Sequence, residues 1–444
     1  MIGIAEANAA SSWESELSTA EGRRIRDAIR HLVPLIRKNA RASEKSGVVA
    51  EETLAALQAT GVFACSLPAE YGGPALGARD LAEILTQVAR GDGSAAWITM
   101  TATAHSRIVL SLPQQAIDEV YADARNWKGP IFAAGSLFSE RIQKAEKVDG
   151  GYIVKAGGVW PFASGCGHAA FSAVGIDYEE ADGHKRRGMV LLDRDQYEIL
   201  DDWDVMGMRA SSSNSLTVTR DVFAPDYRYL DLTDFPKRLE TLHSRYKGLN
   251  YAHGPLGLAL FIGLEMMCTV LGMAKGGLEY MIEQAQARKP YNLPYEKISH
   301  SAASQVSGAK AAAMVASAEA LLMAQADRID RKGLAGEAFT PAEEAEVVMF
   351  MVHAGNVCGQ ALEMMLYTIG SSAVASSNPI QRYLRDAMVC LTHGALRLDP
   401  VAEIYGRQML GQPPFADFSP QTPGVSNANQ EQKTAKSVRT VGAA

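Results

Sequence analysis

The hydrophobic pattern of the 444-residue chain changes its period twice, and this alternation limits the fold more than any other feature. Residues 1–125 carry apolar side chains at helical spacing, whereas residues 126–238 break into short β-rich runs bounded by Gly, Asp and Asn. Long helical patterns return over residues 239–412, and residues 413–444 are polar and proline-containing without periodicity. The sequence therefore predicts an α+β fold with an N-terminal helical domain, a central antiparallel, barrel-like β-domain, a C-terminal helical bundle and a flexible tail.

Helix boundaries in the first domain follow from capping residues. The first helix is expected to begin after a Ser18 cap and to stop at Gly47, and the second to end at Gly61. A longer helix follows, and we expect it to be broken near Gly91 and Gly93 because glycine weakens a helix interior.

The C-terminal domain is predicted to contain four long helical segments: 253–287, 300–331, 341–369 and 379–410. Inside the first of them, residues 255–274 are almost wholly apolar over about the length of a bilayer span. Glu265 lies in the middle of this stretch, and a carboxylate in lipid is costly without a partner. We therefore predict a helix buried on all sides within the bundle and no interaction with a membrane.

The charge balance argues against several classes of protein. The chain has 43 Lys plus Arg against 50 Asp plus Glu and no basic stripe, which argues against nucleic acid as a partner. Its five cysteines are scattered without a CxxC, so neither a disulfide framework nor a metal site is expected. The N-terminal segment lacks the basic and apolar regions of a signal peptide, and a cytoplasmic location is therefore expected.

Phosphate-binding motifs of nucleotide enzymes are missing from the sequence. No GxGxxG follows a predicted strand, and no GxxxxGK[ST] occurs. The chain therefore has no evident site of its own for a nicotinamide dinucleotide or for ATP. If it carries out redox chemistry, the reducing equivalents must come from elsewhere.

Three sequence phrases, one in each predicted domain, resemble the acyl-CoA dehydrogenase superfamily. PAEYGGPALGARDLAEILTQVARGDGSAAW (68–97) is similar to its N-terminal segment, and VMGMRASSSNSLTVTRDVFAPDY (205–227) is similar to its G-x-R-x-S strand pair. GSSAVASSNPIQRYLRDAMV (370–389) is similar to its R-x-x-R-D region. The resemblance implies that superfamily's helical–β–helical fold, and with it a homotetramer.

A histidine occupies the position of the dehydrogenase base. In many acyl-CoA dehydrogenases, a glutamate in an E-G-T phrase after the R-D motif removes the proton beside the thioester carbonyl. The corresponding phrase here is LTHGAL, which places His393 where that glutamate would be. An imidazole with a pKa of about 6.5 is a poor base for that reaction but suits a phenol or an amine.

Further phrases resemble the oxygenase components of two-component flavin monooxygenases of the p-hydroxyphenylacetate 3-hydroxylase type. PFASGCGHA (161–169) is similar to their W-S-S-G-C-x-H-A, and Arg385, Asp386 and His393 follow their order of R-D and then His. The resemblance implies a diffusible reduced flavin, FMN or FAD, which a separate NAD(P)H:flavin reductase supplies. With O2, this flavin would form a C4a-hydroperoxide that hydroxylates a small aromatic substrate, phenolic or polycyclic.

The same resemblance implies roles for three catalytic residues. Ser164, in a tight Ser-Gly turn, would hold the flavin N5 proton in place. His393 would be the base or hydroxyl anchor on the substrate side, and His105 would be a second pocket histidine. Without the resemblance, Ser164 is an ordinary turn serine, and a lone histidine is more often a core or surface residue.

For the flavin phosphate, the resemblance points to Gly370, Ser371 and Ser372, with Arg288 as the basic group. Backbone amides in a Gly-Ser turn form a natural anion site, and an arginine adds charge-assisted hydrogen bonds. The alternative for Arg288 is an ordinary solvated charge at a helix end.

Several other residues have two interpretations. Ser136 and Phe162 would face the flavin, but Phe162 and its neighbour Trp160 can equally belong to the core of the β-domain. Arg385 and Asp386 are expected to form a structural ion pair rather than to take part in catalysis.

Other functions stay open at this point. The chain can be an acyl-CoA dehydrogenase or oxidase with a displaced carboxylate, for which Glu265 and Glu363 are candidates, or a catalytically silent helical scaffold. The flavin chemistry can also oxygenate an amine or a sulfur heterocycle. Ala395 replaces a tyrosine of the phenol hydroxylases, which favours a larger pocket and a bulkier substrate.

Overall fold

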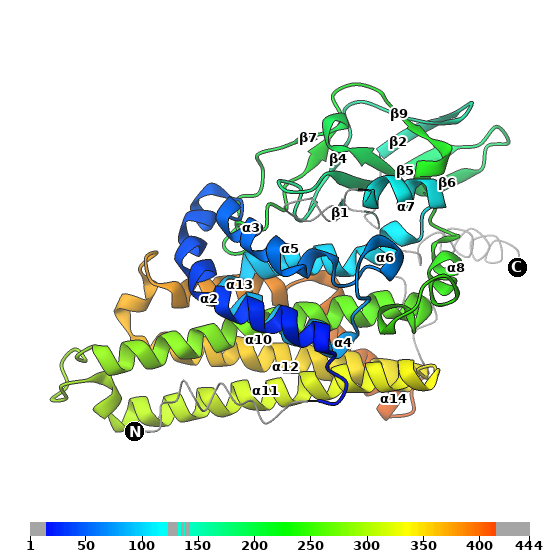
Figure 1. Cartoon of the computed structure of the whole chain (residues 1–444). Helices are drawn as coiled ribbons and strands as arrows, with labels where there is room; N and C mark the ends of the chain where they lie inside the picture. The colour runs from blue at the N-terminus through cyan, green and yellow to red at the C-terminus, as the bar shows by residue number, and fades with distance from the viewer. Residues whose placement is uncertain (1–14, 123–131, 135–136, 138–142, 414–444) are drawn as a thin grey trace, which may run out of the picture.

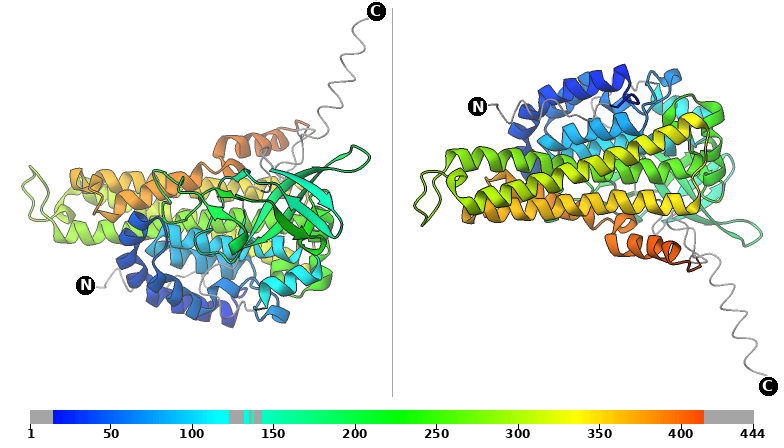
Figure 2. Two further views of the ribbon diagram at one scale, coloured as in Figure 1. Left: turned by 90° about the horizontal axis from the view of Figure 1, so that it is seen from above. Right: turned by 90° about the horizontal axis from the view of Figure 1, so that it is seen from below.

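The computed structural model describes residues 15–122, 132–134, 137 and 143–413, and it has the predicted order of helices, strands and helices. The strands lie above α5 and α6 in Figure 1, and α11 and α12 lie on the opposite side of the helical layers. Figure 2 shows the same stacking from above and below. The predicted α+β fold class is therefore confirmed, while the tail from residue 414 onward and Ser136 lie outside the described residues.

Within the described residues, six α-helices precede the strands: α2 (Ala20–Ser46), α3 (Glu51–Thr60), α4 (Ala78–Gly91), α5 (Gly93–Ala104), α6 (Ser106–Leu110) and α7 (Gln114–Tyr121). The predicted Ser18 cap of α2 is wrong by one residue, because it is the Thr19 side chain that accepts a hydrogen bond from the Gly22 backbone N–H at 2.9 Å. The predicted ends are confirmed, since Gly47 and Gly61 have φ values of +74° and +85° at the C-caps of α2 and α3.

The predicted break between α4 and α5 is present and serves packing. α4 ends at Gly91, and the Asp92 side chain caps α5 by accepting a hydrogen bond from the Ala95 N–H at 2.9 Å. A Cβ at Gly93 would lie 2.5 Å from the sulfur of Met273 and 3.2 Å from the Asp386 Cβ, so the missing side chain lets α10 and α13 pack closely against the break.

Up to residue 413, where the described part of the chain ends, seven α-helices follow the strands: α8 (Phe235–Glu240), α9 (Leu242–Arg245), α10 (Gly254–Ala287), α11 (Ala302–Ala335), α12 (Pro341–Ile369), α13 (Pro379–Leu391) and α14 (Leu398–Met409). The expectation of one continuous helix over 379–410 is wrong, because residues 392–397 separate α13 from α14. Pro400 lies in the first turn of α14, where a missing N–H is tolerated, whereas in the middle of a helix it would break the hydrogen bonding. His393 lies in this break.

The apolar helix α10 lies inside the bundle, where it contacts α4, α11 and α12. Its most apolar 18-residue window is 89% buried, which is the arrangement expected of a core helix. A Cβ at Gly272 would lie 2.4 Å from the Thr86 carbonyl oxygen, so α10 and α4 approach each other closely. By length and composition α11 is also apolar enough to cross a membrane, and 28% of its corresponding window is buried.

The strands are β1 (Phe132–Ala134), β2 (Gln143–Val148), β3 (Gly151–Val154), β4 (Val159–Trp160), β5 (Phe171–Glu179), β6 (Lys185–Asp193), β7 (Glu198–Ile199), β8 (Leu216–Thr217), β9 (Val222–Pro225) and β10 (Tyr229–Asp231). The larger sheet has the order β10-β6-β5-β2-β3-β9, with β1 also paired to β5, and the smaller sheet has the order β4-β8-β7. Most pairs are antiparallel as predicted, but β1 and β2 run parallel to β5 through two short ladders that the sequence did not predict.

Residues 205–211, which follow β7 of the smaller sheet, connect the β-domain to α13 through hydrogen bonds. The Met208 N–H donates to Asp386 Oδ1 at 2.6 Å, and Arg385 donates to the Met206 carbonyl and to the Glu44 carboxylate. The expected ion pair between Arg385 and Asp386 is therefore wrong, because each side chain has other partners. Both are structural: they hold residues 205–211, and the serines that follow, against the helices.

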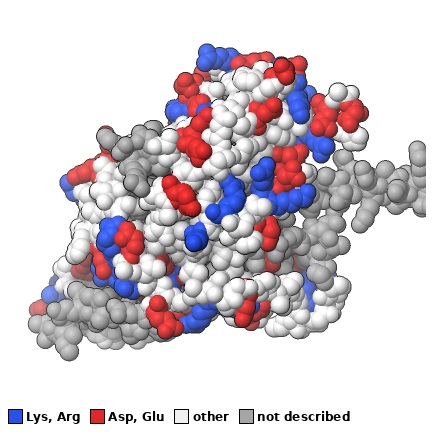
Figure 3. Space-filling model, turned by 45° about the vertical axis from the view of Figure 1, so that its right-hand side comes forward, with Lys and Arg blue, Asp and Glu red and all other residues white. Residues whose placement is uncertain are grey.

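Charges of both signs are interspersed on the face of the molecule in Figure 3, where no continuous area of one sign is visible.

Candidate active site

Ser164 lies in a tight turn between β4 and β5. Its N–H bonds to the Phe162 carbonyl at 2.9 Å, the Ala163 N–H to the Asn214 carbonyl at 3.1 Å, and Gly165 follows with φ of +79°. Phe162 itself has φ of +61°, which is uncommon for a bulky residue and persists only where surrounding bonds impose it. The predicted Ser-Gly turn is therefore present, and its backbone is fixed by contacts with residues 211–214.

The structure separates the two aromatic candidates beside this turn. Trp160 is fully buried and its Nε1–H donates to the Gly175 carbonyl at 2.8 Å, so it belongs to the core of the β-domain. Phe162 is 66% exposed and meets Trp203 edge to face with ring centroids 6.0 Å apart. The turn therefore presents an aromatic surface next to a half-buried serine hydroxyl. A planar ligand ring could stack on the aromatic surface and form a hydrogen bond with the hydroxyl.

The Ser164 hydroxyl has a partner that the sequence did not single out. Ser213 Oγ donates to Ser164 Oγ at 2.9 Å, and Ser211 Oγ lies 2.8 Å from Ser213 Oγ. Ser213 is separated from Ser164 by 49 positions, and no local pattern could have paired them.

Two predicted histidines lie close together on the helical side. His393 is exposed in the break between α13 and α14, and its ring centroid is 6.1 Å from that of Trp97 on α5. His105 lies between α5 and α6. Burial, and then the nearby His393, lower the pKa of His105 to about 4. The structure thus groups both histidines with Trp97, a residue that the sequence analysis did not identify.

Both imidazoles are neutral near pH 7. Although His393 has exposed surface, the protein around it lowers its pKa below the ordinary value of 6.5. A neutral imidazole can accept a proton, and Gly394 beside it leaves space, because a Cβ there would meet no atom within 4 Å. This part of the site can therefore take a proton from a bound hydroxyl group.

The predicted phosphate-binding residues also come together. Arg288, at the end of α10, donates through Nη1 to Ser372 Oγ at 2.5 Å across 84 positions of sequence. Gly370 has φ of +83° at the end of α12, and Ser371 is exposed beside it. A guanidinium, two hydroxyls and a glycine turn at one place fit the phosphate of a flavin.

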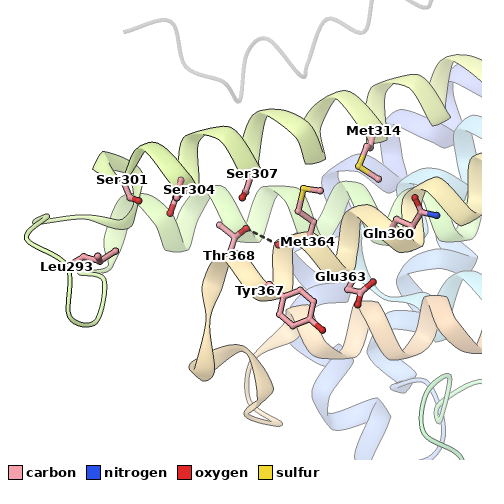
Figure 4. Close-up of a pocket in the computed structure, with 11 residues that line it drawn as sticks. Leu293, Ser301, Ser304, Ser307, Met314, Gln360, Glu363, Met364, Tyr367 and Thr368 are labelled. Atoms are coloured by element: carbon pink, nitrogen blue, oxygen red, sulfur yellow. Dashed lines mark hydrogen bonds between the residues drawn. The ribbon is translucent and has the colours of Figure 1, made fainter.

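A groove of about 620 Å³ opens next to these residues, between α11, α12 and the connection from α10 to α11. Serines of α11 and Tyr367 and Thr368 of α12 line it, as Figure 4 shows. Thr368 lies two residues before Gly370. In Figure 1 the connection from α10 to α11 lies at the end of the molecule away from the strands, so this region is distinct from the Ser164 turn within one chain.

The alternative carboxylates have other surroundings. Glu265 has no exposed surface and accepts a hydrogen bond from Thr103 Oγ1 between α10 and α5, so it cannot touch a substrate. Glu363 is exposed on α12 and lines the groove of Figure 4. Within the described part of the chain, no carboxylate shifts the pKa of either histidine.

Two family models match the chain. The acyl-CoA dehydrogenase N-terminal domain matches residues 19–116, and the acyl-CoA dehydrogenase C-terminal domain matches residues 266–397.

Relatives with hydroxylase and monooxygenase names cover almost the whole chain. The pigment production hydroxylase of Rhodococcus sp. (strain ATCC 21145) is 29% identical, with 88% of this chain and 97% of the relative covered. The p-hydroxyphenylacetate 3-hydroxylase oxygenase component of Acinetobacter baumannii is 26% identical, with 87% and 89% covered. The crystal structure of HsaA from Mycobacterium tuberculosis, a flavin-dependent monooxygenase oxygenase subunit, superposes with a TM-score of 0.76 at 25% identity, with 90% and 100% covered.

Proposed function

The chain belongs to the acyl-CoA dehydrogenase family, and from this premise we propose that it is the oxygenase component of a two-component flavin monooxygenase that hydroxylates an aromatic substrate. The observation that carries the proposal is the pair His393 and His105 beside Trp97, where a dehydrogenase would need an accessible carboxylate. The buried Glu265 does not meet that need.

The residues present suit a reduced flavin, FMN or FAD. Ser164 and Phe162 of one subunit would hold the ring, while Arg288 and Ser372 of a neighbouring subunit would hold the phosphate. When bound, the flavin supplies the electrons that reduce O2, so that one oxygen atom enters the substrate and the other leaves as water.

On the substrate side, His393 would accept the proton of a phenolic hydroxyl group. Its lowered pKa keeps the ring neutral and ready to accept a proton at pH 7. Trp97 offers an aromatic face to the substrate beside this histidine.

The two-component assignment predicts a requirement for a second protein. The purified chain with NADH or NADPH alone should form no hydroxylated product, because it has no dinucleotide-binding motif. Adding any flavin reductase with FMN or FAD should start the reaction on a phenolic or polycyclic substrate, measured as product by chromatography. Product formation coupled to NAD(P)H oxidation without the reductase would contradict the proposal.

The phosphate assignment predicts a selective loss of affinity in Arg288→Ala. A hydrogen bond to a charged group contributes about 1.5–3 kcal/mol, so reduced FMN should bind roughly 10- to 150-fold more weakly in an anaerobic titration. Reduced riboflavin has no phosphate and should bind the variant and the native chain equally. Lys289→Ala is the matched control for a neighbouring cation. Equal losses for FMN and riboflavin would show that Arg288 does not bind the phosphate.

We also propose a homotetramer. The end of the bundle near Arg288 exposes large apolar side chains, with Tyr291 89%, Tyr367 72% and Val374 72% exposed in the single chain. Tyr367 lines the groove, and large exposed apolar side chains of this kind are typical of a subunit contact. A contact there would bring another subunit to the phosphate-binding residues.

A further inference from the structure

Three serine hydroxyls form a continuous hydrogen-bonded chain that ends at Ser164. Ser211 Oγ is 2.8 Å from Ser213 Oγ, and Ser213 Oγ is 2.9 Å from Ser164 Oγ. Ser211 and Ser213 are 1% and 3% exposed, whereas Ser164 is only half-buried. The chain therefore runs from the interior of the β-domain to its surface beside Phe162.

The direction of the chain follows from counting protons. Each hydroxyl donates one hydrogen bond, and Ser213 uses its proton on Ser164. The bond between Ser211 and Ser213 must then be donated by Ser211. Ser164 receives a hydrogen bond and donates none within the described part of the chain, so its own proton is available to a ligand.

Backbone hydrogen bonds of the same segment fix the positions of the three hydroxyls relative to one another. The Gly165 N–H bonds to the Ser211 carbonyl at 2.9 Å, and the Ser211 N–H bonds to the Met208 carbonyl at 3.0 Å. Met208 is in turn fixed by Asp386 of α13. The helical layer therefore sets the position of the serine chain, and the chain sets the position of the Ser164 hydroxyl.

We propose that Ser213, backed by Ser211, is a positioning residue that directs the Ser164 proton outward, toward the bound flavin. This inference rests on the proposed function, because it takes Ser164 as the residue that contacts the flavin ring. By accepting a hydrogen bond, Ser164 also becomes a stronger donor. Without the Ser213 hydroxyl, the Ser164 hydroxyl can rotate, and its proton is no longer held toward the ligand.

A double-mutant cycle in the full-length chain tests this inference. Reduced FMN is titrated anaerobically into the native chain, Ser164→Ala, Ser213→Ala and the double variant. Loss of one hydrogen bond predicts roughly 3- to 10-fold weaker binding in Ser164→Ala and a smaller loss, about 2- to 5-fold, in Ser213→Ala. Because Ser213 acts through Ser164, the double variant should bind no more weakly than Ser164→Ala.

A second readout and two further variants accompany the cycle. The fraction of O2 released as hydrogen peroxide rather than used in product should rise in the same order as the affinities fall. Ser215→Ala is the matched control. Ser215 is 5% exposed on the same segment, but its hydroxyl does not belong to the hydrogen-bonded series of serines. Ser211→Ala removes the hydroxyl that donates to Ser213, and it should weaken FMN binding less than Ser213→Ala does. If Ser213→Ala does not fold, Ser211→Ala takes its place in the cycle.

The outcomes separate this inference from the proposed function. If Ser164→Ala binds reduced FMN like the native chain, the assignment of Ser164 itself fails. If Ser164→Ala binds weakly while Ser213→Ala is unchanged, or if the two losses multiply in the double variant, Ser213 is not a positioning residue.

Discussion

Replacing His393 by alanine should slow formation of the hydroxylated product by about 10²–10⁴, the range of a general base. The substrate proton then lacks an effective acceptor, because burial and the nearby His393 lower the pKa of His105 to about 4 and make it a weak base. The experiment mixes the chain, preloaded anaerobically with reduced flavin, with O2 and substrate, and follows product and hydrogen peroxide. Anaerobic flavin affinity should stay within about twofold of the native value, because His393 is not among the residues proposed to hold the flavin.

His353→Ala is the matched control, since His353 is an exposed histidine of α12. The pH profile gives a second check. Burial lowers the pKa of His393, so the native rate should hold down to below pH 6.5 and then decline as the imidazole gains a proton. His393→Ala should lack this decline. A native rate in His393→Ala would refute the assignment and make His105 the next candidate.

The sequence motif around His393 singled out this residue but did not predict the local backbone structure. Its position after the R-D phrase identified the residue, but periodicity placed it inside a continuous helix over 379–410. The helix is broken there because Pro400 and Gly394 favour a turn, and both signals are visible in the sequence. Apolar periodicity continues across the break, because α13 and α14 both pack against α12.

The fold itself was largely predictable, because a change from helical to alternating period is a local property. The parallel pairing of β1 and β2 with β5 was not, since ladders of three and two residue pairs are set by the path of the chain in space. The same reason explains why Ser213 was missed. Its contact with Ser164 depends on how residues 205–214 are fastened to α13, which no spacing in the sequence reports.

The Arg288–Ser372 contact was predicted as a pair of site residues only through the resemblance to a family. Composition and spacing left Arg288 as an ordinary helix-end charge, and 84 positions separate it from Ser372. Trp97 had no signal at all, because an aromatic residue at helical spacing is equally typical of a core. Its position near His393 follows from the packing of α5 against α13.

Glu265 combines features that make stability depend on pH. It is fully buried in α10, and burial raises its pKa to about 8, although the Thr103 hydrogen bond and the nearby Arg107 act in the opposite direction. Arg107 is also buried, its pKa is lowered to about 10, and it donates to the Asn250 carbonyl. Glu265 is therefore protonated at neutral pH in the folded chain and ionised in the unfolded chain.

Glu265→Gln should remove a large pH dependence of the free energy of unfolding. The folded state keeps a proton that the unfolded state loses above a pKa of 4.5, so this stabilisation is full below pH 4.5 and is lost as the pH rises to about 8. The gap corresponds to about 5 kcal/mol. Relative to the native chain, Glu265→Gln should therefore gain about 4 kcal/mol between pH 5 and pH 9, measured by denaturant unfolding at fixed protein concentration.

The comparison between variants isolates Glu265 from other buried acids such as Asp386, whose raised pKa of about 7 changes stability in the same direction in both chains. Glu363→Gln is the matched control, because Glu363 is exposed and its replacement should leave the difference from the native chain independent of pH. A constant loss of stability in Glu265→Gln at every pH would mean that Glu265 is ionised and paired with Arg107. The buried carboxyl would then be half of an ion pair that links α6 to α10, rather than a neutral hydrogen-bonding group.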